Sequence, residues 1–202
     1  MTVTYLACLA LGYLIGSLSV SILISKYIFH QDVRTLGSGN AGAANAARTL
    51  GAGVGLLTLL GDFLKGVISM LLGSCLGGAT GLAIAGAACM IGHCFPIYFG
   101  FKGGKAVATA AAVALMIDWR VFLSAFAVFA IVAALSKTAS VSSMSASVAV
   151  AAMTPVFTHN PVLISLGIFT CLLVLLMHRS NIRRLISGTE PHFHFGKHPG
   201  KQ

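Results

Sequence analysis

The chain has 202 residues, of which 57% are hydrophobic and 8% charged, and its mean hydropathy is +0.93. Soluble domains carry about a quarter charged residues, so this composition excludes an ordinary soluble globule and indicates lipid as the solvent for much of the surface. The formal net charge of +9 does not indicate nucleic-acid binding, because the basic residues lie between apolar segments, as they do in membrane proteins.

The apolar segments predict an all-α, polytopic membrane protein that forms one domain over residues 1–202. Unbroken apolar runs lack the alternation of a membrane barrel, so helices are the expected spanning form. A full span needs about 20 residues, and two of the segments are shorter, so five spans with re-entrant pieces are the alternative to about seven. The segments run roughly over 3–25, 52–76, 79–95, 106–117, 120–136, 143–158 and 162–178.

The lysines and arginines predict the orientation of these spans. Arg120 is the only one expected outside, and Lys65 lies within a span. The asymmetry predicts a periplasmic N-terminus and a cytoplasmic C-terminus, with function in Gly-rich cytoplasmic loops. Residues 192–202 are expected to form a mobile tail. The basic residues expected on the inner side are Lys26, Arg34, Arg48, Lys102, Lys105, Lys137, Arg179, Arg183, Arg184, Lys197 and Lys201.

The first polar stretch, GSGNAGAANAARTLG over 37–51, has the glycine spacing of a dinucleotide fingerprint. That interpretation fails because the preceding HQDVRTL is too polar for a buried strand, and because Asp62 lies in an apolar helical run rather than at a strand end. Bare backbone still suits a close anion. We expect Asn40 to cap a helix over 41–50 whose positive end faces that anion.

Arg48 is the one charged residue of this stretch, and it shares a helical face with Asn45 and Ala41. A guanidinium binds phosphate oxygens with two parallel hydrogen bonds. The alternative is tight packing of small residues, with Arg48 extending to the membrane surface.

The second stretch, GHCFPIYFGFKGGKAVATA over 92–110, places two glycines and a lysine before a helix start. It is not a Walker A loop, because Phe99 stands where that loop needs glycine. Gly103, Gly104 and Lys105 could still hold a phosphate with backbone N–H groups and a point charge. For Lys102, contact with lipid headgroups is the simpler interpretation.

Three further groups complete the candidates. In HRSNIRRLISGTE over 178–190, His178 and Asn181 share a helical face, although a satisfied interfacial histidine is an equal alternative. Glu190 is a candidate partner for one of the nearby arginines. In SKTASVSSMSAS over 136–147, the serines suit helix packing, and Ser140 could donate to an anion.

Asp62 and Lys65 lie three residues apart inside a predicted span, where neither charge should occur without a partner. A mutual ion pair is the simpler interpretation, and a polar pair facing the site is the alternative.

Two anion-binding stretches on one membrane face, with few acids, indicate a phosphate-bearing substrate and little affinity for divalent metals. No Ser-His-Asp series and no His-x₄-Asp motif is evident. The chemistry should therefore depend on a pre-activated substrate and its positioning.

In order and spacing, GSGNAGAANAARTLG, GDFLKG, GHCFPIYFGFKGGKAVAT and HRSNIRRLISGTE closely resemble the bacterial acyl-phosphate-dependent glycerol-3-phosphate acyltransferase family. The resemblance covers nearly the whole chain. It implies a multi-pass enzyme of the bacterial inner membrane with its active site on the cytoplasmic face. Such an enzyme moves an acyl group from acyl phosphate to the 1-hydroxyl of glycerol 3-phosphate, in the first step of phospholipid synthesis, with no metal or cofactor. A membrane carrier for phosphate esters or other organic anions is the alternative.

The resemblance also implies residue roles. It gives Glu190 a structural role, and it shows two departures, since Ala44 replaces a threonine and Ala106 a glycine. We expect altered substrate affinity at most from these. The catalytic candidates are Ser38, Arg48, Lys105, His178 and Asn181. The candidates for substrate or phosphate binding are Gly39, Asn40, Asn45, Gly103, Gly104 and Ser140.

Overall fold

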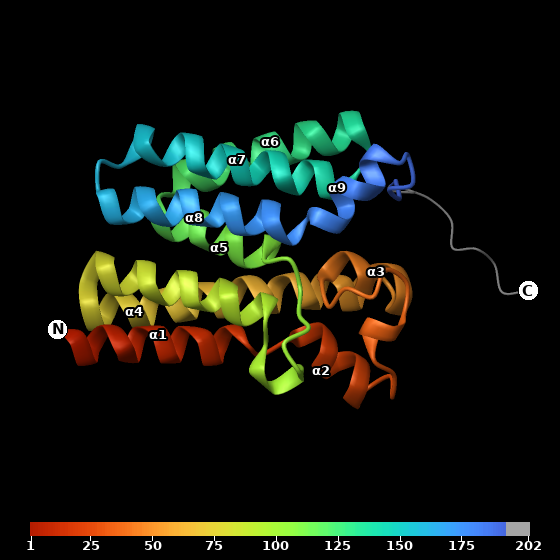
Figure 1. Cartoon of the computed structure of the whole chain (residues 1–202), viewed down its shortest axis with the longest axis horizontal. Helices are drawn as coiled ribbons and strands as arrows, with labels where there is room; N and C mark the ends of the chain where they lie inside the picture. Colours follow the sequence, from red (N-terminus) through yellow and green to blue (C-terminus); the bar gives the residue numbers. More distant parts are fainter. Residues whose placement is uncertain (193–202) are drawn as a thin grey trace, which may run out of the picture.

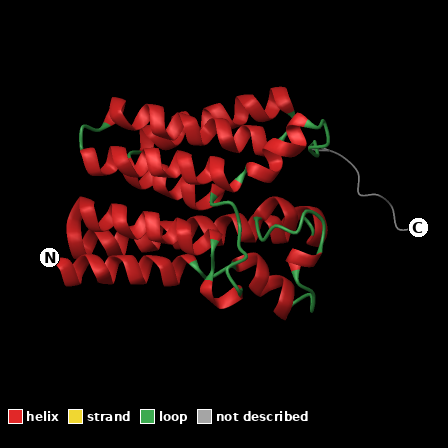
Figure 2. Cartoon of the chain, in the orientation of Figure 1, coloured by secondary structure: helices red, strands yellow, loops and turns green. Residues whose placement is uncertain are grey.

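The computed structural model describes residues 1–192, and this part of the chain contains helices and no strand (Figure 2). Of the tail predicted over 192–202, only His192 lies inside the described residues. The α-helices are α1 (Thr2–Gly16), α2 (Val20–Tyr27), α3 (Ala43–Leu50), α4 (Ala52–Cys94), α5 (Val107–Ile117), α6 (Trp119–Ser136), α7 (Ala139–Phe157), α8 (Pro161–Met177) and α9 (Arg179–Ile186); the short 3₁₀ turns are η1 (Val33–Thr35) and η2 (Ile97–Phe99).

The helices form two layers, one of α1 and α4 with the short α2 and α3, the other of α5 to α8 (Figure 1). Figure 1 places the N-terminus and the turn between α7 and α8 at one end of the molecule, and α2, α3 and α9 at the other. The turn between α7 and α8 and the polar segments around α2, α3 and α9 therefore lie at opposite ends of the molecule.

The long α4 is two antiparallel helices joined at Gly77 and Gly78, whose backbone is not helical. Gly78 has φ of +59°, a conformation that favours glycine. Near the turn the two arms touch through backbone, because a Cβ on Gly73 would lie 2.4 Å from the Gly81 carbonyl oxygen. Further along, the Ser69 hydroxyl donates to the Ala85 carbonyl at 3.2 Å. The sequence prediction of separate apolar segments over 52–76 and 79–95 is therefore confirmed.

The apolar segment predicted over 3–25 is one candidate span, Thr2–Tyr27, but its helix is broken, because α1 ends at Gly16 and α2 begins at Val20. Serines compensate for the broken backbone. The Ser17 hydroxyl donates to the Tyr13 carbonyl at 2.8 Å and accepts from the N–H of Ile97 at 3.4 Å. The break therefore lies against the polypeptide that follows α4.

Large apolar side chains cover much of the outer surface, among them Leu56, Leu57, Phe126 and Leu172, each more than half exposed. A surface of this kind suits lipid. Within residues 1–192, four helical stretches are long and apolar enough to cross a membrane, or five if α8 and α9, bent by 55°, form one span. The two arms of α4 count here as one stretch. The number of seven spans stays a prediction.

Candidate functional site

The first polar loop, residues 28–42, is held in shape by Asn45 of α3. Its side-chain N–H groups donate to the Val33 and Leu36 carbonyls, each at 3.0 Å, and its carbonyl oxygen accepts from the N–H of Ser38 at 2.9 Å. Asn45 is buried, whereas Ser38 is exposed. Asn45 therefore positions Ser38, and all three of these hydrogen bonds are to the backbone of the loop.

The prediction that Asn40 caps a helix over 41–50 is wrong. The helix begins at Ala43, Gly42 is its N-cap residue, and no side chain caps it. Asn40 instead lies beside Gly42, since a Cβ on that glycine would be 2.8 Å from the Asn40 amide nitrogen. Gly39, with φ of +71°, forms the turn before it by donating its N–H to the Leu36 carbonyl at 3.0 Å.

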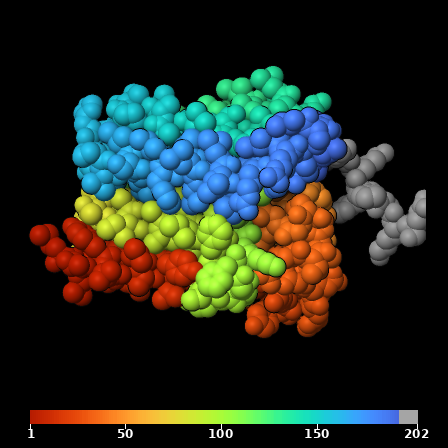
Figure 3. Space-filling view, viewed as in Figure 1, coloured from red at the N-terminus to blue at the C-terminus, as the bar shows by residue number. Residues whose placement is uncertain are grey.

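Arg34 joins the first loop to the second loop, residues 95–106, and sequence analysis did not single it out. Its guanidinium makes two hydrogen bonds to Asp32, at 3.0 and 2.8 Å, and donates to the Phe99 carbonyl at 2.6 Å. Asp32 in turn accepts from the N–H of Arg34 at 3.0 Å. The Asp-x-Arg spacing is a local signal that could have indicated this junction. In Figure 3 the second loop appears on the surface between α1 and the α2–α3 region.

The glycines of the second loop serve close packing rather than anion binding through their N–H groups. The Gly103 N–H donates to the Cys94 carbonyl at 3.1 Å, and the Gly104 N–H to the His93 carbonyl at 3.0 Å. A Cβ on Gly104 would lie 2.1 Å from His93 Nε2. The predicted backbone donors are thus used inside the protein, and the absence of side chains lets the loop lie directly on His93.

Ala106, which stands where the family resemblance expects glycine, is the buried N-cap residue of α5 and has φ of +59°. This conformation costs an L-residue about 1–2 kcal/mol, while burial of the methyl group stabilises the fold by about 0.8 kcal/mol. The departure from glycine therefore costs little stability.

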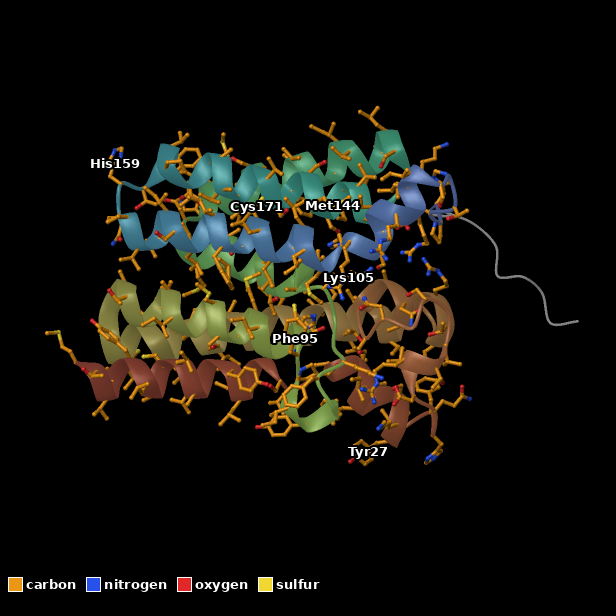
Figure 4. The ribbon with its side chains drawn as sticks, in the orientation of Figure 1. Tyr27, Phe95, Lys105, Met144, His159 and Cys171 are labelled. Atoms are coloured by element: carbon orange, nitrogen blue, oxygen red, sulfur yellow. The ribbon has the colours of Figure 1, made fainter. Side chains whose placement is uncertain are left out.

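Lys105 lies between the two layers (Figure 4). Its ammonium donates to the side-chain oxygen of Asn181 in α9. Burial lowers the pKa of Lys105 to about 8; repulsion from Arg184 and Arg48 acts in the same direction, and Glu190 acts against it. Lys105 is therefore mostly charged at pH 7 and loses its proton as the pH rises through about 8, in a site with excess positive charge.

Glu190 connects Asn181 to two further side chains. Its Oε1 accepts from the Asn181 amide and from the Ser140 hydroxyl, both at 2.6 Å, and its Oε2 accepts from Arg184 Nε at 2.7 Å. Burial alone would raise the pKa of the Glu190 carboxyl, but these hydrogen bonds bring it below its ordinary value. The predicted pairing of Glu190 with a nearby arginine is confirmed, and Ser140 binds this carboxylate.

His178 lies at the bend between α8 and α9 and is 3% exposed. Its Nδ1 is 2.8 Å from the Val174 carbonyl oxygen. A carbonyl only accepts, so Nδ1 carries the proton, and in the neutral imidazole Nε2 is left as an acceptor.

Arg48 stands in the last turn of α3 with an exposed side chain. Its positive charge is close enough to Lys105 to act, after burial and Arg184, in lowering the pKa of that lysine. The structure thus brings Arg48, Lys105 and Asn181 into one region. Ser140 is linked to this region through its hydrogen bond to Glu190.

An apolar groove of about 90 Å³ lies between α5, α6, α7 and α8 and begins two residues after Lys105. On the α7 side it begins at Ser143, one turn beyond Ser140. Its lining includes Val107, Ala110, Phe126, Ala146, Ser147 and Val174. The lining of this groove therefore includes residues that closely follow Lys105 and Ser140 in the chain.

Comparison with known proteins agrees with this geometry. Residues 6–188 match the family model described as "Glycerol-3-phosphate acyltransferase". Proteins named glycerol-3-phosphate acyltransferase from Syntrophotalea carbinolica and Thioalkalivibrio sulfidiphilus are 40% and 42% identical, over 96% and 92% of this chain and 99% and 92% of theirs.

The fold is similar to crystal structures of PlsY, an integral membrane glycerol 3-phosphate acyltransferase. Its glycerol 3-phosphate form has a TM-score of 0.89 and 34% identity, covering 94% of this chain and 96% of that one. Its lysophosphatidic acid form has a TM-score of 0.86 and 33% identity, covering 94% and 95%. The chain is an integral membrane protein that belongs to the glycerol-3-phosphate acyltransferase family.

Proposed function

We propose that this protein transfers a fatty acyl group from acyl phosphate to the 1-hydroxyl of sn-glycerol 3-phosphate. The products are 1-acylglycerol 3-phosphate and inorganic phosphate. The enzyme acts in the bacterial cytoplasmic membrane, with its N-terminus in the periplasm and its active site at the cytoplasmic face.

The observation that carries this proposal is the convergence of Lys105, Arg48 and the Asn181–Glu190 pair beside an apolar groove. Two substrates that each bear a phosphate need cations, and an acyl chain needs an apolar slot. The related PlsY structures in glycerol 3-phosphate and lysophosphatidic acid forms support the acceptor and the product.

The reaction needs no protein nucleophile, because acyl phosphate is a mixed anhydride with a good leaving group. The acceptor hydroxyl oxygen attacks the acyl carbonyl carbon and forms the new ester bond. The bond from that carbon to the phosphate oxygen breaks, and phosphate leaves with the electron pair. The hydroxyl proton passes to a phosphate oxygen. Catalysis is then positioning and charge stabilisation.

Lys105 and Arg48 bind the two phosphates in this mechanism. Asn181 directs the Lys105 ammonium by accepting a hydrogen bond from it, and Glu190 fixes the orientation of the Asn181 amide. His178 presents Nε2 as an acceptor that orients the glycerol hydroxyl. Ser38 lies in the loop that Asn45 holds in shape, and it stabilises the negative charge that develops in the transition state.

The groove between α5 and α8 holds the first part of the acyl chain. Its lining starts at Val107, two residues after Lys105, and continues between the helices, and in this proposal the acyl phosphate group lies at Lys105. An acyl chain can therefore remain in apolar surroundings while its phosphate stays in the charged region.

The test measures formation of labelled lysophosphatidic acid by purified protein in detergent, from palmitoyl phosphate and radiolabelled glycerol 3-phosphate. Parallel reactions use acyl-CoA and acyl-carrier-protein thioesters. We expect product from acyl phosphate alone, and none from Lys105→Ala. Lys102→Ala is the matched control, because that side chain is exposed and three residues away.

Product from a thioester at a comparable rate would refute the choice of donor. No product from any donor, with glycerol 3-phosphate still bound, would instead favour an organic-anion carrier. Unimpaired turnover by Lys105→Ala would refute the role given to that lysine.

A further inference from the structure

Beneath the second loop lies a buried polar cluster that the proposed mechanism does not use, formed by Asp62, Lys65 and His93. All three belong to α4, the first two to one arm and His93 to the other. They are 1%, 6% and 4% exposed. Charges buried at membrane depth are costly and usually serve a purpose beyond packing.

Lys65 is the centre of this cluster. Its ammonium nitrogen lies 2.8 Å from Asp62 Oδ1, 2.6 Å from the Leu18 carbonyl oxygen and 3.0 Å from His93 Nδ1. An ammonium has three protons and no lone pair, so it only donates, and His93 Nδ1 is the acceptor in their contact. The His93 proton then lies on Nε2, the side of the ring that faces Gly104.

The cluster joins two irregular segments. Through Leu18 it holds the break between α1 and α2, and through His93 it supports the second loop. The loop contacts His93 at two points. The Gly104 N–H donates to the His93 carbonyl at 3.0 Å, and the Gly104 backbone packs against the ring. Lys105 is the next residue, so the position of the ring sets where its side chain begins.

The ion pair inside the cluster is not well satisfied as a hydrogen bond. Although Asp62 Oδ1 is close to Lys65, it receives no hydrogen bond of acceptable geometry among the described residues. Buried charge pairs stabilise a fold poorly even with good geometry, so stability alone does not account for this pair. The ammonium is directed instead towards Leu18 and His93.

We propose that the Asp62–Lys65–His93 cluster is a positioning device for the active site, which fixes the Gly103–Gly104 turn and thereby places the ammonium of Lys105. Its residues act through Lys105 and do not touch the reacting atoms. The kinetic consequence rests on the proposed acyltransfer, whereas the structural consequence for Lys105 does not.

The first experiment neutralises the ion pair with Asp62→Asn and Lys65→Met together, because removing one partner would leave an unpaired buried charge. The matched control is Asp118→Asn with Arg120→Met, an exposed pair that lies 2.9 Å apart at the start of α6. Folding is checked by thermal melting and by elution in detergent.

Two readouts follow in the folded proteins. One is kcat and KM with palmitoyl phosphate and glycerol 3-phosphate. The other is the pH dependence of acetic anhydride labelling at Lys105, measured by mass spectrometry against the exposed Lys102. For the cluster variant we expect kcat to fall between about ten- and hundredfold. A displaced Lys105 gains solvent, so its labelling midpoint should rise from about 8 by about one pH unit.

Wild-type rates and an unchanged labelling midpoint in a folded cluster variant would overturn the proposal. If the wild-type protein uses no acyl donor, the proposed function fails on its own. The labelling of Lys105 would then still decide whether the cluster positions it.

A second experiment remains decisive if the cluster variant does not fold. A Cβ on Gly104 would lie 2.1 Å from His93 Nε2, so Gly104→Ala should displace the loop and lower kcat about tenfold or more. Adding His93→Asn removes the outer ring atoms and keeps an acceptor for Lys65. The double variant should regain at least about threefold in kcat over Gly104→Ala. Two losses that simply add would mean that the His93–Gly104 contact does not control the site.

Discussion

The pH dependence of catalysis follows from the environment of Lys105, whose pKa burial lowers to about 8. The folded protein disfavours the charged form, so the ammonium persists below this pH and is lost as the pH rises through it. Between pH 7 and pH 9 the charged fraction falls from about nine tenths to about one tenth. A lysine of ordinary pKa would stay almost fully charged over this range.

If Lys105 must be a cation to bind phosphate, kcat/KM should fall about tenfold between pH 7 and pH 9. This ratio reports the free enzyme, in which no substrate phosphate restores the pKa. The assay follows lysophosphatidic acid formation from palmitoyl phosphate, with uncatalysed hydrolysis subtracted and folding checked at each pH. Lys105→Arg keeps its charge throughout, so residual activity in that variant should not decline above pH 8.

Arg184 provides an internal check on the cause. Arg184→Gln removes a charge that repels Lys105 and frees Glu190, which attracts it. Both effects raise the pKa of Lys105, so the alkaline midpoint should move to higher pH. A kcat/KM that stays flat from pH 7 to pH 9.5, or a Lys105→Arg variant with the wild-type midpoint, would refute the reasoning.

Three further variants test the surroundings of the site. Glu190→Gln can keep both contacts at Oε1 but presents an N–H to Arg184, so thermal unfolding should show a loss of about 2 kcal/mol, and unchanged stability would contradict the role of this carboxylate. Asn45→Ala removes three hydrogen bonds, which should cost about 2–4 kcal/mol and lower kcat by displacing Ser38; full activity would mean that the loop holds its shape without Asn45. Ala146→Phe narrows the apolar groove between α5 and α8, so the rate with palmitoyl phosphate should fall about tenfold or more while glycerol 3-phosphate binding is kept, and an unchanged rate would place the acyl chain elsewhere.

Much of the architecture could be predicted because the relevant signals are local. Apolar runs and their separating turns follow from hydropathy, and the two arms of α4 were expected from Gly77–Gly78. The Asp62–Lys65 ion pair follows from two charges one helical turn apart. Glu190 was a candidate partner for an arginine because it lies close to a basic cluster, and Arg184 is that partner.

The errors arose where a residue's partner is set by tertiary structure. Gly103 and Gly104 suit an anion by composition, but the carbonyls that receive their N–H groups belong to the preceding helix end. Asn45 shares a helical face with Arg48, yet its amide is used by a loop nine to twelve residues earlier. No sequence periodicity reveals where an irregular loop presents its carbonyls.

The break after α1 and the importance of His93 were missed for a related reason. Ser17, Ser19 and Ser21 alternate with apolar residues, and this spacing could have indicated interrupted helix, because such side chains can satisfy freed backbone groups. His93 has a polar neighbour only when the arms of α4 fold together, which places it beside Lys65, 28 residues away.

The contact between Lys65 and the Leu18 carbonyl spans 47 residues, and this separation constrains how the protein enters its membrane. During synthesis from the N-terminus, the broken first segment reaches the lipid before Lys65, the donor to the Leu18 carbonyl, has been made. Lys65 alone would likewise be an isolated cation in the bilayer, with Asp62 as its only local partner. Each segment is therefore a poor independent insertion unit, and both become stable when the α4 hairpin docks on α1. Biogenesis should thus proceed by joint release of the first three apolar segments into lipid, rather than one helix at a time.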